Sequence, residues 1–302
     1  MEIACWSRSG WISACLSAIS NVPLINWFFA KETAMRAPLF LISLALSSAA
    51  CSDAADYADK AGVEETPAAS VKASAVAAAE AYSVEQETER FQFAYAWPAA
   101  AAAEPALAAY LGKKADAMLA EVRGEADEEW DAAKGEDWVS RQHSASEEWK
   151  VVADLPRFLS LSGHLATYSG GAHGLYGMES LVWDREKRRA MRGIELFNSP
   201  VSLEQGLGQR LCDRLNAARE KRRGTKIEEG SKEMFDKCPG LDEADVLVGS
   251  SNGKTFDRIT VYFGPYVAGS YAEGDYELDF NVTASILDAV KPEFASAFSV
   301  RS

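Results

Sequence analysis

The sequence has few histidines, few cysteines and too little positive charge to balance its acidic residues. Of its 302 residues, three are histidines and five are cysteines, and the formal net charge is −14. Three scattered histidines do not have the spacing of a metal site, so we expect no metal and no cofactor. A chain this acidic repels phosphate backbones, which excludes nucleic acid as a partner bound through a general electrostatic field.

Long apolar runs are also scarce. The most apolar stretch near the N-terminus, residues 37–46, is too short for a stable membrane-spanning helix. It follows Met35 and Arg36 and precedes small residues at 47–50, which is the pattern of a signal peptide. We therefore predict that translation starts at Met35, that residues 1–34 come from an upstream start, and that residues 35–50 are a signal peptide. The alternative is an N-terminal membrane anchor that uses both apolar stretches.

A cysteine follows the predicted cleavage site. Residues 48–51, Ser-Ala-Ala-Cys, resemble a bacterial lipobox, although lipoproteins usually carry leucine where Ser48 stands. The resemblance predicts a lipid on Cys51, while ordinary signal peptidase could cut the same bond without lipidation. Residues 51–84 are rich in Ala, Ser, Glu and Asp and predict a flexible tether. These features predict a periplasmic protein held at the inner or outer membrane by its lipid.

Residues 85–302 carry the patterns of a folded body. Alternating apolar residues predict strands at 91–97, 149–155, 159–165, 175–183, 246–248, 259–263 and 276–280. Apolar residues three or four apart predict a helix from 104 to 134, which Gly124 would end or kink, and a second from Pro200 to Arg223 with Ser199 as its N-cap. A short helix is expected at 284–290. The order predicts an α+β fold, a mostly antiparallel sheet with two principal helices packed on it.

The folded body contains two cysteines, Cys212 and Cys238. In an exported protein an even pair predicts a disulfide, which would stabilise the fold by roughly 3 kcal/mol in the chain-entropy model. Two unpaired thiols are the alternative. The wide spacing disfavours a redox or metal motif.

Two glycine-containing segments beside aromatic residues are the candidate contact surface. The first holds Gly170, Gly171, His173 and Tyr176, and the second holds Tyr262, Tyr266 and Tyr271. Glycine lets a backbone turn tightly or approach a partner closely. His173 is also a weak candidate for a general base, but no Gly-x-Ser-x-Gly motif accompanies it, so a locally packed turn histidine is the simpler interpretation.

The other polar candidates have simpler explanations. His143 is expected in a polar loop, and His164 on an exposed strand face. Acidic pairs such as Glu147-Glu148 could be glycosidase carboxylates, but a solvated acidic surface is the favoured interpretation.

Three phrases in the folded body resemble a known family. They are Tyr-Ser-Gly-Gly-Ala-His-Gly at 168–174, Gly-Ile-Glu-Leu-Phe at 193–197 and Val-Tyr-Phe-Gly-Pro-Tyr-Val-Ala at 261–268. In this order they are similar to the extracytoplasmic domains of PdaC peptidoglycan deacetylases and RsiV anti-sigma factors, over roughly residues 86–290. Ser169 stands where that family usually has Thr, and Glu195 where it has Asp. The catalytic deacetylase module of PdaC and the sigma-binding segment of RsiV are not expected in this chain.

The resemblance implies a non-catalytic domain at the cell envelope. We expect an envelope-tethered module, not an enzyme, that binds an envelope polysaccharide or a protein. Because RsiV members bind lysozyme, a basic protein, a lysozyme receptor or inhibitor is one alternative, and the net charge of −14 is compatible with it. The other alternative is a cell-wall hydrolase with a site centred on His173.

Overall fold

The computed structural model describes residues 79–228 and 230–301. The predicted upstream segment 1–34, the signal peptide 35–50 and the lipidation site Cys51 lie outside these residues. In the described part of the chain, no helix is long and apolar enough to cross a membrane. The folded body begins at Tyr82, slightly before the predicted boundary at residue 85, because Tyr82–Glu87 is a strand.

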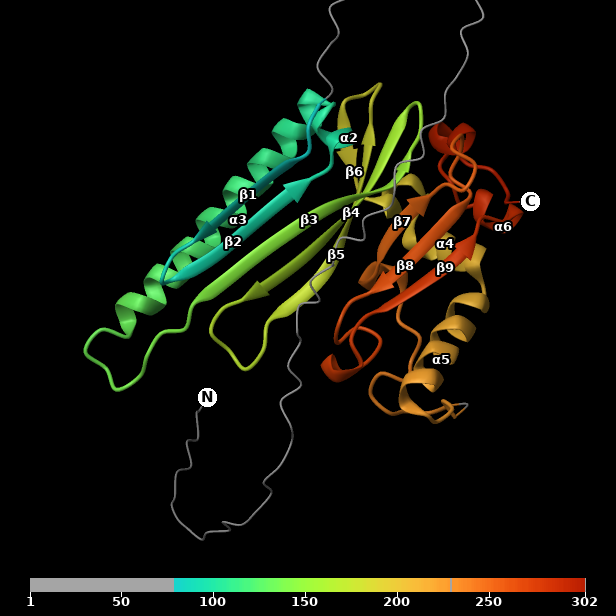
Figure 1. Ribbon diagram of the computed structural model, residues 1–302. Helices are drawn as coiled ribbons and strands as arrows, with labels where there is room; N and C mark the ends of the chain where they lie inside the picture. Colours follow the sequence, from blue (N-terminus) through green and yellow to red (C-terminus); the bar gives the residue numbers. More distant parts are fainter. Residues whose placement is uncertain (1–78, 229, 302) are drawn as a thin grey trace, which may run out of the picture. The chain divides into compact units, whose positions relative to one another are not determined.

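Six strands form the first sheet in the order in which they occur along the chain (Figure 1). All neighbours are antiparallel except β2 and β3, which run parallel. The strands are β1 (Tyr82–Glu87), β2 (Phe91–Trp97), β3 (His143–Asp154), β4 (Phe158–Tyr168), β5 (Leu175–Asp184) and β6 (Arg189–Met191). The predicted strand at 91–97 has the observed bounds, whereas β1 and the start of β3 were not predicted.

A long helix makes the crossover between the parallel strands. The short helix α2 (Ala99–Ala102) leads into α3 (Pro105–Ala132), which packs on β2 and β3. Its buried stripe includes Leu107, Leu111 and Val122. The predicted break at Gly124 is wrong: α3 continues through this residue, which lies in open space with no neighbouring atoms to deflect the helix.

A second sheet has three antiparallel strands, β7 (Asp245–Gly249), β8 (Arg258–Phe263) and β9 (Tyr276–Asn281). Its core is shared with α4 (Pro200–Leu207), α5 (Arg210–Arg223) and α6 (Ala284–Leu287) (Figure 1). Short 3₁₀ turns complete the fold: η1 (Gly193–Leu196), η2 (Leu241–Glu243), η3 (Tyr271–Glu273) and η4 (Pro292–Ala297). The predicted α+β class with mostly antiparallel pairing is confirmed, but the strands form two sheets.

The predicted second helix is two helices. Ser199 caps α4 as expected, because its hydroxyl accepts a hydrogen bond from the Ser202 amide at 3.0 Å. The helix ends where Gly208 adopts φ of 58°, and α5 begins at Arg210. All four leucines of the predicted stripe are nevertheless buried, namely Leu203, Leu207, Leu211 and Leu215. A four-residue spacing therefore predicted the buried face but not the break. The last helix, α6, is also shorter than expected.

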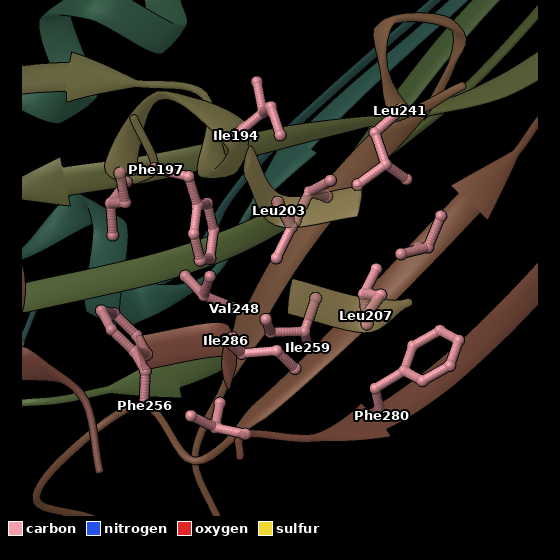
Figure 2. Close-up of a cluster of buried hydrophobic side chains, with 14 of the residues drawn as sticks. Ile194, Phe197, Leu203, Leu207, Leu241, Val248, Phe256, Ile259, Phe280 and Ile286 are labelled. Carbon is pink, nitrogen blue, oxygen red and sulfur yellow. The ribbon is translucent and has the colours of Figure 1, made fainter. Parts of the chain in front are cut away.

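Figure 2 shows the apolar core of the second sheet. Leu203 and Leu207 of α4 and Ile286 of α6 lie among side chains of β7, β8 and β9, represented by Val248, Ile259 and Phe280 (Figure 2). Burial of these surfaces stabilises the fold by about 25 cal/mol for each Å² removed from water.

The two sheets meet at a close backbone contact. The Ser180 hydroxyl on β5 donates to the Val246 carbonyl on β7 at 2.7 Å and accepts from the Gly193 amide at 2.8 Å. A Cβ atom on Gly193 would lie 1.9 Å from the Val246 oxygen. Only glycine permits this approach, so Gly193 fixes how closely the sheets dock.

Candidate functional site

Four aromatic side chains from two distant segments form one cluster, which we call the aromatic cluster: His173, Tyr176, Tyr266 and Tyr271. Tyr271 is at its centre. The rings of Tyr271 and His173 are stacked with centroids 3.9 Å apart, and those of Tyr271 and Tyr266 are 5.6 Å apart. Tyr176 meets Tyr271 edge-on at 6.0 Å. The structure thus brings together four of the seven residues predicted as a contact surface.

Hydrogen bonds join the two segments of the cluster. The Tyr271 hydroxyl donates to the Gly174 carbonyl at 2.8 Å, across a separation of 97 residues. The hydroxyl of Tyr176 donates to Asp275 at 3.4 Å, and burial together with the charge of Asp275 raises the pKa of Tyr176. These contacts hold the two segments of the cluster together.

The cluster is largely exposed to solvent. Tyr266 is 50% exposed and Tyr176 is 38% exposed, and the His173 side chain is exposed as well. Tyr266 has φ of 68°, a left-handed conformation that disfavours residues with a Cβ atom. Exposed aromatic rings in a constrained backbone are typical of binding surfaces, where large rigid side chains supply contact area at low entropic cost.

The predicted glycines have different structural roles. Gly170 adopts φ of 81°, and a Cβ there would lie 2.9 Å from a Glu129 oxygen. Gly171 has no such restriction, but its carbonyl accepts hydrogen bonds from Arg141 at 3.1 Å and from the Tyr168 hydroxyl at 3.0 Å. Gly170 therefore shapes the β4–β5 hairpin, whereas Gly171 anchors it through its backbone.

Tyr262 lies apart from the aromatic cluster. It is only 4% exposed and packs against Met178 and Leu247 where the two sheets meet. Burial raises the pKa of its hydroxyl strongly. Tyr262 therefore belongs to the packing between the two sheets and does not offer a free face.

A groove of about 720 Å³ lies beside Tyr176. One side is the face of the first sheet that α3 does not cover, and the other is β8 and β9. We call it the acidic groove, because carboxylates line it against one histidine, His164; they are Glu85, Glu148, Asp275 and Glu277. His164 is exposed, as predicted. The floor of the groove is made of small side chains such as Ala94 and Ala166, so that it is open to solvent.

The surroundings of His173 limit its chemistry. Its Nδ1 lies 2.9 Å from the Gly174 carbonyl and must donate to it, so that Nε2 is the acceptor for the Tyr266 hydroxyl at 3.3 Å. The residues that hydrogen-bond this histidine supply no carboxylate to orient it as a general base. Within residues 79–228 and 230–301, no group of three or more His, Cys, Asp or Glu side chains is placed to hold a metal ion.

The structure contains a buried polar network that the sequence analysis did not predict. His143 was expected in a loop, but it begins β3, is buried, and has its Nε2 atom 2.6 Å from Glu129 of α3. Glu147 was expected on the surface, but it is 4% exposed. Both expectations were wrong because the alternation that begins at Trp149 extends back to His143, and these polar residues occupy its inward positions. The alternation itself was the available signal.

The predicted disulfide is present in the structure. Cys212 of α5 and Cys238 make a disulfide with Cα atoms 5.5 Å apart. The bridge closes a loop with a sequence separation of 26 and ties the first turn of α5, not its basic end as the sequence suggested, to the segment before β7.

Comparisons with known proteins identify part of the chain. The family model described as "Deacetylase PdaC" matches residues 84–176. We call these residues, which are similar to the PdaC model, the PdaC-type segment. The predicted resemblance is thereby confirmed over this part, which includes the first of the three quoted phrases. The PdaC-type segment contributes β1 to β4, α3 and the hairpin that carries His173.

Solved structures from the DUF3298 family are similar to a larger share of the chain. One, from Bacteroides fragilis NCTC 9343, is 15% identical with a TM-score of 0.42, and the alignment covers 72% of this chain and 96% of that one. Another, from Pseudomonas aeruginosa PAO1, is 15% identical with a TM-score of 0.40, covering 73% and 95%. None of the curated proteins compared with this chain matches it.

Proposed function

We propose that this protein is an envelope-tethered, non-catalytic binding module. The observation that carries the proposal is the aromatic cluster, in which two segments 93 residues apart in sequence present exposed, stacked rings on one surface. Binding energy in protein interfaces is concentrated in such aromatic side chains.

The charge of the neighbouring groove favours a basic partner. The acidic groove presents four carboxylates beside the aromatic cluster, on a chain with a net charge of −14. Complementary charge accelerates association and excludes partners of the same sign. Among the partners expected from the sequence, lysozyme fits this charge, and an uncharged envelope polysaccharide would depend mainly on the aromatic rings.

A binding role accounts for His173 better than a general-base role. Its ring is stacked on Tyr271, and its Nδ1 is committed to a backbone carbonyl instead of a carboxylate. This geometry fixes the ring as part of a surface. A cell-wall hydrolase centred on His173 is therefore the less supported alternative.

The envelope location rests on the N-terminal pattern. The signal peptide at 35–50 and the lipid on Cys51 would place the module in the periplasm, attached to a membrane. Intact mass of the protein purified from cells tests this directly. Cleavage before Cys51 with added acyl mass supports the proposal, and an uncut, unmodified chain contradicts it.

Alanine substitution tests the contact surface. We expect Tyr271→Ala in the full chain to weaken binding to lysozyme or to purified peptidoglycan at least tenfold, because a central aromatic residue carries a large share of interface energy. Tyr110→Ala is the matched control, since Tyr110 is 41% exposed but lies on α3 outside the cluster. Both partners are titrated by calorimetry at moderate salt. If Tyr271→Ala left every measured affinity unchanged, the aromatic cluster would not be the contact surface.

A further inference from the structure

The loop between α3 and β3, residues 133–142, presents two apolar side chains to solvent. Trp138 is 45% exposed, and its neighbour Val139 is 85% exposed. Among the larger apolar side chains in the described part of the chain, Val139 is the most exposed. We call Trp138 and Val139 the apolar tip. Neither residue belongs to the aromatic cluster, so their exposure requires an explanation of its own.

Hydrogen bonds attach the α3–β3 loop to the β4–β5 hairpin. The Arg141 guanidinium donates through Nη1 to the Gly171 carbonyl and to the Tyr168 hydroxyl, both at 3.1 Å. The hairpin in turn accepts a hydrogen bond from Tyr271 at the Gly174 carbonyl. The loop, the hairpin and the segment with Tyr271 are therefore consecutive neighbours at one end of the sheets (Figure 1). The surface that carries the aromatic cluster continues onto the loop.

The loop carries negative charge that its own basic residues do not neutralise. Glu136 and Asp137 are exposed directly before the apolar tip. Of the two basic residues of the loop, Lys134 is paired with Asp131 at 2.6 Å, and Arg141 is bound to the hairpin. The apolar tip is thus flanked by carboxylates, as the aromatic cluster is flanked by the acidic groove. Complementary charge favours a basic partner at both places.

The apolar tip distinguishes between the two kinds of partner considered for the aromatic cluster. A tyrosine ring can stack on a sugar or on a protein side chain. Val139 has neither a π face nor a side-chain hydrogen-bonding group, so it gains free energy only when an apolar surface of the partner covers it. Folded proteins offer such surfaces, whereas a polysaccharide offers mainly hydroxyl groups. Tryptophan is also among the residues that contribute most to protein interfaces.

We propose that the apolar tip and the aromatic cluster form one interface for a folded protein with a basic surface, in which Trp138 contributes binding energy beside Tyr271. The interface rests on the proposed binding function and adds the α3–β3 loop to its contact surface. The added loop commits the partner to a protein instead of a polysaccharide. Arg141 is a positioning residue, because it holds the loop against the hairpin.

Titration with a folded basic protein tests the contribution of the loop. The probe is lysozyme, titrated by calorimetry at moderate salt into the full chain and its variants. We expect Trp138→Ala to weaken binding about tenfold and Val139→Ser to weaken it by a smaller factor, because each removes apolar contact area. Both side chains are exposed, so the variants should keep the wild-type melting temperature. Val201→Ser is the matched control, since Val201 is exposed on α4 and should leave the affinity unchanged.

Tyr271→Ala, measured in the same series, separates the role of the loop from the proposed function. If Tyr271→Ala weakens binding and the two loop variants do not, the aromatic cluster is the contact surface without the loop, and the larger interface is wrong. If all three variants bind like the wild type, the proposed contact surface fails as a whole. The commitment to a protein partner is overturned if lysozyme does not bind the wild-type chain, or if Trp138→Ala weakens binding of soluble peptidoglycan equally.

Discussion

The two sheet regions differ in how completely their buried polar groups are hydrogen-bonded. Five buried side-chain atoms lack a hydrogen-bond partner in the described chain, and all belong to the first sheet: Trp97 Nε1, His143 Nδ1, Glu147 Oε1, Ser160 Oγ and Trp183 Nε1. In the second region the most deeply buried charge, Arg219, is fully engaged. Its guanidinium donates to the carbonyls of Ala268, Asp236 and Lys237 and to the Asn216 side chain.

This difference separates two roles. The second region is cross-linked by the Cys212–Cys238 disulfide and by Arg219, which suits a rigid support for Tyr266 and Tyr271. The first region has a sheet face that α3 leaves open and cavities lined by carboxylates. Unsatisfied groups mark places where a ligand gains most by binding. The unsatisfied polar groups therefore lie in the first region, and the stabilising cross-links lie in the second.

The substitution Arg219→Leu is the strongest test of the difference between the two regions. The substitution would leave three backbone carbonyls without their buried donor, and we expect the free energy of unfolding to fall by about 3–5 kcal/mol. Urea denaturation followed by circular dichroism measures it. Lys221→Leu, at an exposed position of the same helix, should change stability by less than about 0.5 kcal/mol. Equal effects of the two variants would contradict the role assigned to Arg219.

Lowering the pH is expected to have an intermediate effect on the free energy of unfolding. Partial burial would raise the pKa of Glu273, but hydrogen bonds from Arg223 and Tyr276 outweigh it and lower the pKa to about 2. Since the folded-state pKa is below its usual value of 4.5, the unfolded chain takes up the proton first as the pH falls. The contribution of Glu273 is present above pH 4.5 and lost toward pH 2, and it amounts to about 2 kcal/mol.

The measurement is the free energy of unfolding against pH for the wild type and for Glu273→Gln. The variant should be less stable at neutral pH, and its stability should fall less between pH 4.5 and 2. Parallel curves would show that the Arg223–Glu273 pair does not stabilise the second region.

The smallest expected effect lies in the first region and has the opposite sign. Gly124 is inside α3, is exposed, and has no atoms within 4 Å of where a Cβ would lie. Gly124→Ala should therefore stabilise the protein by about 0.5–1 kcal/mol, because alanine loses less conformational entropy in a helix. Thermal unfolding would show a slightly higher Tm. A lower Tm would mean that α3 bends at this point and needs its glycine.

Several features of the fold follow from one local pattern of residues and could be predicted from it. The alternation of 91–97, the cap at Ser199 and the four-residue leucine spacing each specify a face or an end without reference to the rest of the chain. The pairing of strands and the burial of a side chain depend on residues that are distant in sequence. For this reason the second sheet was not predicted, whereas the burial of His143 and Glu147 was missed although the alternation along β3 indicated it.

The candidate site shows the same limit. The glycine-rich hairpin and the tyrosines were recognisable as separate segments, but their stacking depends on how the sheets dock through Ser180, Gly193 and Val246. Tyr262 shares the composition of the exposed tyrosines yet is buried, because its position on β8 faces Met178. The composition of the two segments identified them in the sequence. The docking of the two sheets determines which of their side chains are exposed to solvent.

The distance in sequence between His173 and Tyr266 has a consequence for how the aromatic cluster forms during folding. Because the stacked rings come from segments 93 residues apart, the aromatic cluster forms only when both segments have folded and docked. If the aromatic cluster is the contact surface that we propose, a proteolysed or partly unfolded chain would not bind its partner.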